Sequence, residues 1–193
     1  MDWQHLNVKF FVEDPETVDL APYTAVFNRW IQEKAVGDEL LIDVADYRHV
    51  PDGPGVVLVG HESNYSLDNA EGRLGVLYNR KAPVTGTPGQ RLAQAVRAAL
   101  LAARRLAADP GLRVSGQSLQ LIVNDRLLAP NTPEILAEMQ PELTAFFDKL
   151  YGPGSYTVER REEPRARLTL DIRAKDPIGV EGLLERLGAL EAA

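Results

Sequence analysis

Residues 56–81 read VVLVGHESNYSLDNAEGRLGVLYNRK, and this stretch decides the expected fold class. The apolar run Val56–Val59 is followed by mixed polar residues, by a turn-forming segment at 69–72 and by a second strand pattern at 74–81. A strand that is apolar on both faces is typical of the middle of a sheet. Turn residues between two strand patterns predict an antiparallel hairpin. We expect the chain to stay extended through residue 68 before it turns.

The position of this turn sets which side chains lie opposite one another. Successive residues of a strand point to opposite faces, so residues two apart share a face. A turn centred on 69–72 predicts the pairs Leu67 with Leu74, Tyr65 with Val76, Ser63 with Tyr78, and His61 with Arg80. These pairs place His61, Ser63, Tyr65, Tyr78 and Arg80 on one wall of the hairpin.

Hydrophobic periodicity elsewhere predicts a mixture of strands and helices. Leu6, Val8, Phe10 and Val12 alternate with other residues, which predicts a strand with a wet or half-covered second face. The remaining expected strands are at 39–47, 118–124, 156–158 and 168–172, and the expected helices are at 22–37, 90–107, 133–151 and from 177 onward.

The order of these elements suggests two related halves. Residues 1–108 give β-α-β-β-β-α and residues 116–193 give β-α-β-β-α. VKFFVED at 8–14 resembles LQLIVND at 119–125, which indicates either a duplication or a chance similarity of two strand endings. Each half is close to the split βαβ arrangement. We therefore expect an α+β fold with an antiparallel sheet, helices on one face, and two ferredoxin-like (βαββα) halves in tandem that share one core.

The composition excludes several classes of protein. The chain has 193 residues, 45% of them apolar, and no cysteine. A normal apolar content argues against a disordered chain, and the lack of cysteine excludes thiol catalysis, iron–sulfur clusters and disulfide scaffolds. The net charge of −7 argues against non-specific nucleic-acid binding by the whole chain.

Positive charge is concentrated in one segment. Residues 72–108 contain seven arginine or lysine residues and no acidic residue, whereas the rest of the chain holds 14 basic and 28 acidic groups. This segment either pairs with acidic helices of the same chain or presents an anion-binding or partner-binding face.

The sequence also predicts a location. The first residues lack the basic and apolar regions of a signal peptide. The longest apolar runs have four or five residues, whereas a membrane span needs about 20. We expect a cytoplasmic protein that binds neither membrane nor nucleic acid.

The polar segment His61–Tyr65 is the strongest candidate for a functional site. With Tyr78, Arg80 and Lys81 it could hold a small anionic ligand through hydroxyl and guanidinium groups. The first hypothesis is therefore a non-enzymatic domain, expected to be a homodimer, that uses Ser63, Tyr78, Arg80 and Lys81 to bind such a ligand or a protein partner. Alternatively, this segment is an ordinary solvated hairpin with no role in binding.

The second hypothesis is an enzyme. His61 would act as general acid or base, because imidazole titrates near neutral pH. Tyr65 and Arg80 would position an oxyanion, and Glu62 or His49 would assist. A metal-dependent version, with ligands from Asp43, Asp46, His49, His61 and Glu62, has less support, since no His-Glu-x-x-His motif is present. The sequence assigns no metal ligand and identifies no cofactor.

Overall fold

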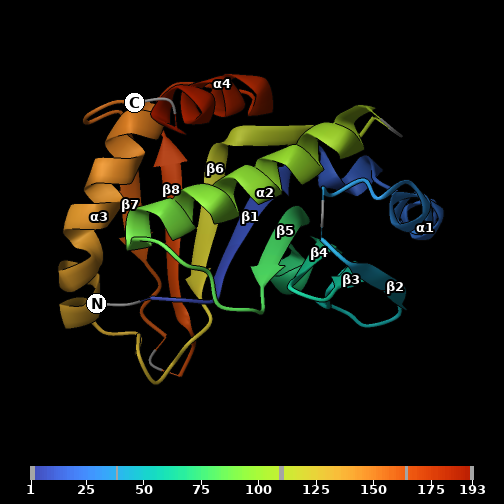
Figure 1. The fold of residues 1–193 in the computed structure, drawn as a ribbon, viewed down its shortest axis with the longest axis horizontal. Coiled ribbons are helices and arrows are strands. Elements are labelled where there is room, and N and C mark those ends of the chain that lie inside the picture. The colour runs from blue at the N-terminus through green and yellow to red at the C-terminus, as the bar shows by residue number, and fades with distance from the viewer. Residues whose placement is uncertain (1–2, 38, 109–110, 164, 192–193) are drawn as a thin grey trace.

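The computed structural model describes residues 3–37, 39–108, 111–163 and 165–191. Eight strands and four α-helices, with two short 3-10 turns, follow one another along the chain (Figure 1). Their order is β1 (Leu6–Val12), η1 (Pro15–Thr17), α1 (Tyr23–Glu33), β2 (Leu41–Tyr47), β3 (Gly55–Gly60), β4 (Ser63–Asp68), η2 (Ala70–Gly72), β5 (Gly75–Arg80), α2 (Pro88–Ala108), β6 (Val114–Val123), α3 (Pro133–Tyr151), β7 (Tyr156–Arg160), β8 (Leu168–Ala174) and α4 (Val180–Glu191).

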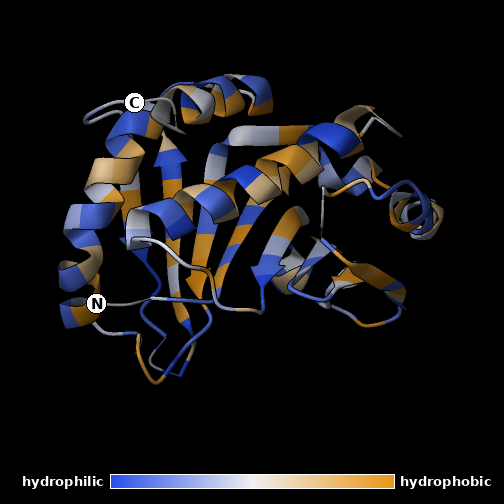
Figure 2. Cartoon of the chain, in the orientation of Figure 1, coloured by the Kyte–Doolittle hydropathy of each residue, from blue (hydrophilic) through white to orange (hydrophobic). Residues whose placement is uncertain are grey.

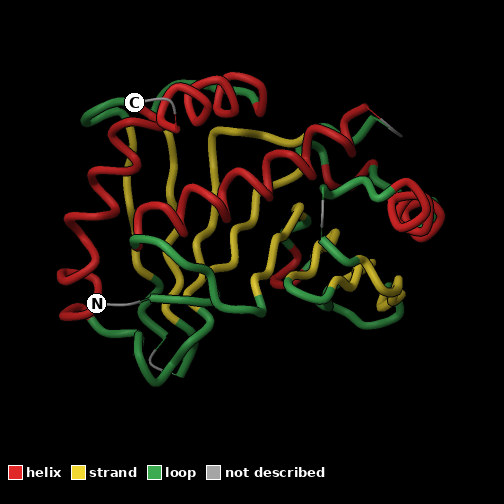
Figure 3. The backbone as a smooth tube through the Cα atoms, in the orientation of Figure 1, coloured by secondary structure: helices red, strands yellow, loops and turns green. Residues whose placement is uncertain are grey.

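All eight strands belong to a single sheet in the order β2-β3-β4-β5-β1-β6-β8-β7 (Figure 3). Every neighbouring pair is antiparallel. The two parts of the chain join where β1 pairs with β6, with Val8 opposite Leu121. The predicted α+β fold with an antiparallel sheet is confirmed.

The two faces of the sheet differ in chemistry. On β1, Leu6, Val8 and Phe10 point toward the helices and are almost fully buried. The α2 helix runs across β1 and β5 in front of the sheet and supplies a stripe of buried leucine, valine and alanine (Figure 1). The alternation of apolar and polar residues along the strands is visible in Figure 2. This one-sided pattern is what an α+β fold with helices on one face requires.

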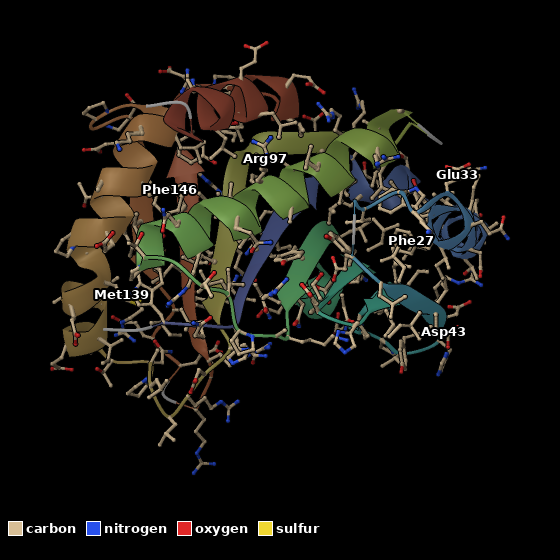
Figure 4. All side chains as sticks on the ribbon, viewed as in Figure 1. Phe27, Glu33, Asp43, Arg97, Met139 and Phe146 are labelled. Carbon is tan, nitrogen blue, oxygen red and sulfur yellow. The ribbon has the colours of Figure 1, made fainter. Side chains whose placement is uncertain are left out.

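The α1 helix packs near the β2 edge of the sheet. Its side chain Phe27 points inward, whereas Glu33 at its end points to solvent (Figure 4). The helix ends where Lys34 adopts a left-handed conformation and its N–H bonds the carbonyls of Trp30 and Ile31. Trp30 stays in the core beside Phe27, with ring centroids 5.3 Å apart.

Each part of the chain begins with a strand, a helix and a strand, and further strands lie between those two strands in the sheet. The two parts differ in the number of strands that lie between them. In the second part β8 lies between β6 and β7, which is a split βαβ unit in the predicted order β-α-β-β-α. In the first part three strands, β3, β4 and β5, lie between β1 and β2. The tandem of two ferredoxin-like halves, 1–108 and 116–193, stays a prediction.

The additional strand arises because the chain reverses where we expected it to continue. Residues 56–68 form two strands instead of one, since the chain turns back at His61 and Glu62 and pairs Val59 with Asn64. A Cβ atom on Gly60 would lie 2.6 Å from the carbonyl oxygen of Ser63, so only glycine fits this close approach. The prediction of one extended segment is wrong for that reason.

The register of the β4–β5 hairpin is also shifted by two residues from the prediction. Tyr65 lies opposite Tyr78, and Ser63 lies opposite Arg80. The loop between the strands spans residues 69–74 and contains η2, in which Glu71 has φ of 63°. A shift of two residues keeps every side chain on its predicted face. The partners therefore change, while Ser63, Tyr65 and Tyr78 still share one face.

No helix within the described ranges is long and apolar enough to cross a membrane.

Gly55 provides a test of the hairpin geometry. It has φ of +62°, and a Cβ atom there would lie 2.1 Å from the carbonyl oxygen of Leu67. Gly55→Ala should lower the free energy of unfolding by about 3 kcal/mol or more, because it adds a backbone clash to the conformational penalty. Gly154→Ala is the matched control, since Gly154 has φ of +68° with open space around it. It should lose about 1 kcal/mol. Equal losses in urea unfolding would contradict the pairing of β3 with β4.

Candidate functional site

Three of the predicted site residues lie together under the helices. Tyr65 and Tyr78 are cross-strand partners whose ring centroids are 5.3 Å apart, and they are 3% and 1% exposed. Ser63 is fully buried on the same face. The Tyr78 hydroxyl accepts a hydrogen bond from Gln94 Nε2 on α2 at 2.9 Å. These groups are therefore part of the layer between sheet and helices, where a ligand reaches them only through a cavity.

Glu39 completes this polar cluster, although no sequence pattern pointed to it. Its carboxylate accepts hydrogen bonds from the Ser63 hydroxyl and from the Tyr65 hydroxyl, the latter at 3.1 Å. Burial and the nearby negative charge of Glu39 raise the pKa of Tyr65 far above its usual range. Tyr65 is consequently a neutral hydrogen-bond donor at physiological pH and does not act as a base.

His61 lies apart from this cluster. It occupies the exposed β3–β4 turn, where its backbone N–H donates to the carbonyl of Leu40 at 2.8 Å. The predicted pairing of His61 with Arg80 is wrong, because Ser63 takes that position. The structure thus brings Ser63, Tyr65, Tyr78 and Arg80 to one face of the sheet, as predicted, but leaves His61 in the turn outside the sheet.

The basic pair Arg80 and Lys81 supports the same turn. Arg80 lies 3.0 Å from the Glu62 carboxylate and donates through Nε to the Ala82 carbonyl at 2.8 Å. The Lys81 ammonium donates to the Gly60 carbonyl at 2.5 Å. Both cations therefore hold the end of β5 against the β3–β4 turn, and a ligand would have to compete with these contacts.

A cavity of about 360 Å³ opens between α1 and α2 with Tyr65 among its lining residues. We call it the α1–α2 cavity. Its walls are mostly apolar, with Trp30 from α1 and Ala98 and Ala102 from α2. Two cations, Arg104 and Arg105, stand at its edge in the last turns of α2 and are exposed. The cavity therefore combines an apolar interior with positive charge, and its arginines belong to the basic segment 72–108.

The opposite face of the sheet carries a second polar region. Asn7 and Lys9 alternate with the apolar residues of β1 and point away from the helices, yet they are only 1% and 3% exposed. The buried polar residues of this face are Asn7, Lys9, Ser66, Asp68, Gln120 and Thr169. Buried polar groups are uncommon unless they are paired, so this face is a candidate site in its own right.

Charged side chains connect distant parts of this face. The Lys9 ammonium lies 2.5 Å from the Asp68 carboxylate. The Arg73 guanidinium stacks over the Phe11 ring at 3.9 Å and lies 3.3 Å from Asp171. Asp171 on β8 also accepts from Arg161 Nε at 2.7 Å and from Gln120 Nε2 at 3.2 Å.

A further ion pair, between Arg161 and Glu71, joins the loop 69–74 to the second part of the chain. We call Glu71, Arg73, Gln120, Arg161 and Asp171 the Asp171 network. Its members come from four separate segments, which is why sequence patterns did not reveal it. The one available signal was the polar second face of the strand at 6–12.

The metal hypothesis receives no support from the geometry. Across residues 3–37, 39–108, 111–163 and 165–191, no three histidine, aspartate or glutamate side chains gather closely enough to hold a metal ion. The predicted candidate ligands therefore form no such group; these are Asp43, Asp46, His49, His61 and Glu62.

The chain matches no protein family, and no curated protein is detectably similar to it.

The Lys9–Asp68 pair yields a stability prediction. Burial lowers the pKa of the Lys9 ammonium, whereas the adjacent Asp68 opposes that shift. Lys9→Met leaves the buried Asp68 carboxylate without its cation, with the Ala70 N–H at 3.3 Å as its remaining hydrogen-bond donor, and should cost about 3 kcal/mol or more in the free energy of unfolding. The double variant Lys9→Met/Asp68→Asn should recover most of this loss. Urea unfolding of the wild type, Lys9→Met, Asp68→Asn and the double variant measures the coupling energy between the two residues. Additive losses in the free energy of unfolding would contradict a buried ion pair.

The Asp171 network predicts a pH dependence. Burial opposes ionisation of Asp171, but hydrogen bonds from Arg161 and Gln120 outweigh it and lower the pKa of this carboxyl below its ordinary value. The stabilisation is present above the unfolded pKa of about 4 and is lost as the pH falls through the lower folded value. Asp171→Asn should therefore lose less stability than the wild type between about pH 5 and pH 2. Asp43→Asn, an exposed residue outside the network, should track the wild type. Parallel curves for Asp171→Asn and wild type would refute this role.

Proposed function

We propose that this protein binds a small amphipathic anion in the α1–α2 cavity. The observation that carries the proposal is an apolar cavity with two exposed arginines at its edge. A volume of about 360 Å³ lies within the range of small-molecule sites, about 300 to 1,000 Å³. The ligand we propose has an apolar body and one carboxylate or similar anionic group.

The chemistry of the lining supports this ligand class. Trp30 and Ala98 offer apolar surface, which favours burial of a hydrocarbon or aromatic body. The guanidinium groups of Arg104 and Arg105 offer several N–H donors each, which suits bidentate binding of a carboxylate. Among the residues that the structure describes, Arg104 forms an ion pair only with the distant Glu181, at 3.9 Å, and both side chains of that pair are more than half exposed. Such a pair is weak and yields readily to a ligand.

Tyr65 links this proposal to the predicted hairpin. Its ring lines the cavity while its hydroxyl donates to Glu39. The hydrogen bond fixes the ring, so the cavity wall is rigid before a ligand arrives, and a preorganised wall reduces the entropic cost of binding.

The other hypotheses have weaker support. An enzyme that combines His61 with Tyr65 and Arg80 would need side chains that the fold places in an exposed turn, in the core and in an ion pair with Glu62. A protein partner, a homodimer and a cytoplasmic location stay predictions of the sequence.

Titration calorimetry with octanoate, octanol and inorganic phosphate tests the proposal. Octanoate should bind, octanol should bind more weakly, and phosphate should show little heat. The double variant Arg104→Ala/Arg105→Ala should weaken octanoate binding by about tenfold, which corresponds to one charge-assisted hydrogen bond, and should leave octanol unchanged. Arg126→Ala, an exposed arginine of the β6–α3 loop, is the matched control.

A cavity-filling variant provides an independent check. Ala98→Trp should abolish binding of octanoate and octanol alike, because the indole would occupy the cavity. Thermal unfolding of Ala98→Trp verifies that the protein still folds, and Ala98→Leu serves if it does not. Undiminished octanoate binding by a folded, cavity-filled variant would refute the proposed location.

A further inference from the structure

A second cavity, of about 350 Å³, lies on the sheet face that points away from the helices. We call it the β-face cavity. Its lining comes from β1, β6, β8 and β7, which are four adjacent strands, and from Arg73 in the loop before β5. Ser118 lies opposite Arg173, and Arg173 lies opposite Thr157, so one row across three strands presents a hydroxyl, a guanidinium and a second hydroxyl. A floor built from paired strands is rigid, which suits a binding site.

Charge in this cavity is divided between two groups. Arg73 and Arg173 are cationic, whereas Glu159 and Asp171 are anionic and lie directly opposite each other on β7 and β8. A simple anion would meet two carboxylates here, and a simple cation would meet two guanidinium groups. The lining therefore favours a molecule that carries both charges.

The hydrogen bonds show which of these groups are available. Asp171 already accepts bonds from Arg73, Arg161 and Gln120, so its charge is compensated. Arg73 uses one of its N–H groups for Asp171 while its plane is held against Phe11, and its side chain is 38% exposed. The guanidinium has five N–H donors, so others remain for a ligand.

Arg173 and Glu159 are the uncommitted pair. Both side chains are exposed, and within the described part of the chain neither forms an ion pair with another residue. They project from neighbouring strands into the same cavity. Arg173 and Glu159 are diagonal neighbours across β8 and β7, so a cation and a carboxylate are available side by side for the carboxylate and the ammonium group of one small ligand.

We propose that the β-face cavity binds a free α-amino acid as a zwitterion. Arg173, assisted by Arg73, binds the carboxylate through charge-assisted hydrogen bonds, and Glu159 accepts from the ammonium group. The hydroxyls of Ser118 and Thr157 supply further donors and acceptors, while Phe11 offers apolar surface for the ligand side chain. The site is separate from the α1–α2 cavity and lies on the other face of the sheet.

The test is a titration of the full chain, monitored by the backbone amide NMR signals, with each of the common L-amino acids in turn. At least one should shift the signals of Ser118, Thr157 and Arg173. Its N-acetyl derivative lacks the ammonium charge and its methyl ester lacks the carboxylate. Each derivative should bind at least about tenfold more weakly than the amino acid, as expected for loss of one charge-assisted hydrogen bond.

Variants identify the groups responsible. Arg173→Ala should weaken binding of the amino acid to the level of its methyl ester, and Glu159→Gln should weaken it to the level of its N-acetyl derivative. Arg126→Ala is the matched control and should bind like the wild type. Both site residues are exposed, so these variants should keep the wild-type unfolding temperature.

Two results would overturn the inference. One is that no amino acid shifts the signals of the cavity residues. The other is that inorganic phosphate binds as tightly as any amino acid and binds more tightly to Glu159→Gln, which would define a plain anion site. Neither result bears on octanoate binding, so this inference and the proposed function fail independently.

Discussion

The antiparallel pairing of β1 with β5 on one side and with β6 on the other holds the whole molecule together. Val8 lies opposite Tyr78 in one ladder and opposite Leu121 in the other. All three side chains point to the helices and are buried, and α2 packs over β1 and β5, so this row of apolar contacts links the sheet, the helix layer and the junction of the two parts. The same pairing necessarily turns Asn7 and Lys9 to the opposite face. The β-face cavity, which residues of β1 and β6 help to line, depends on this register.

The two faces offer different binding chemistry. On the helix side, the layer between sheet and helices is apolar, and a cavity there acquires charge only at its edge, from Arg104 and Arg105. On the other side, charged groups lie directly on the strands, and the Asp171 network orders them. A hydrocarbon body and a small zwitterion thus match different faces of the same sheet.

The sequence was enough to predict the features that depend on apolar–polar alternation along a strand, namely which side chains share a face. The alternation in β1 correctly predicted a buried apolar face, but the second face, expected to be wet or half-covered, is also closed to solvent, because Asn7 and Lys9 are only 1% and 3% exposed. The shared face of Ser63, Tyr65 and Tyr78 survived a register shift of two residues. The alternation did not reveal the reversal at His61, because polar residues alternate in the same way whether a strand continues or turns. Gly60 was the only local sign, and its meaning depends on the approach of the Ser63 carbonyl. Glu39 and the Asp171 network escaped because tertiary packing alone brings those segments together.

The position of β1 in the sheet also shapes how the chain must fold. The β1 strand acquires one neighbour only when β5 is available and the other only when β6 is available. Ladders that join such distant segments require large loops to close before any contact is gained, which slows folding of antiparallel sheets. Pairing of β1 with β6 closes the longer of the two loops, so the junction of the two parts carries the larger entropic cost of assembly.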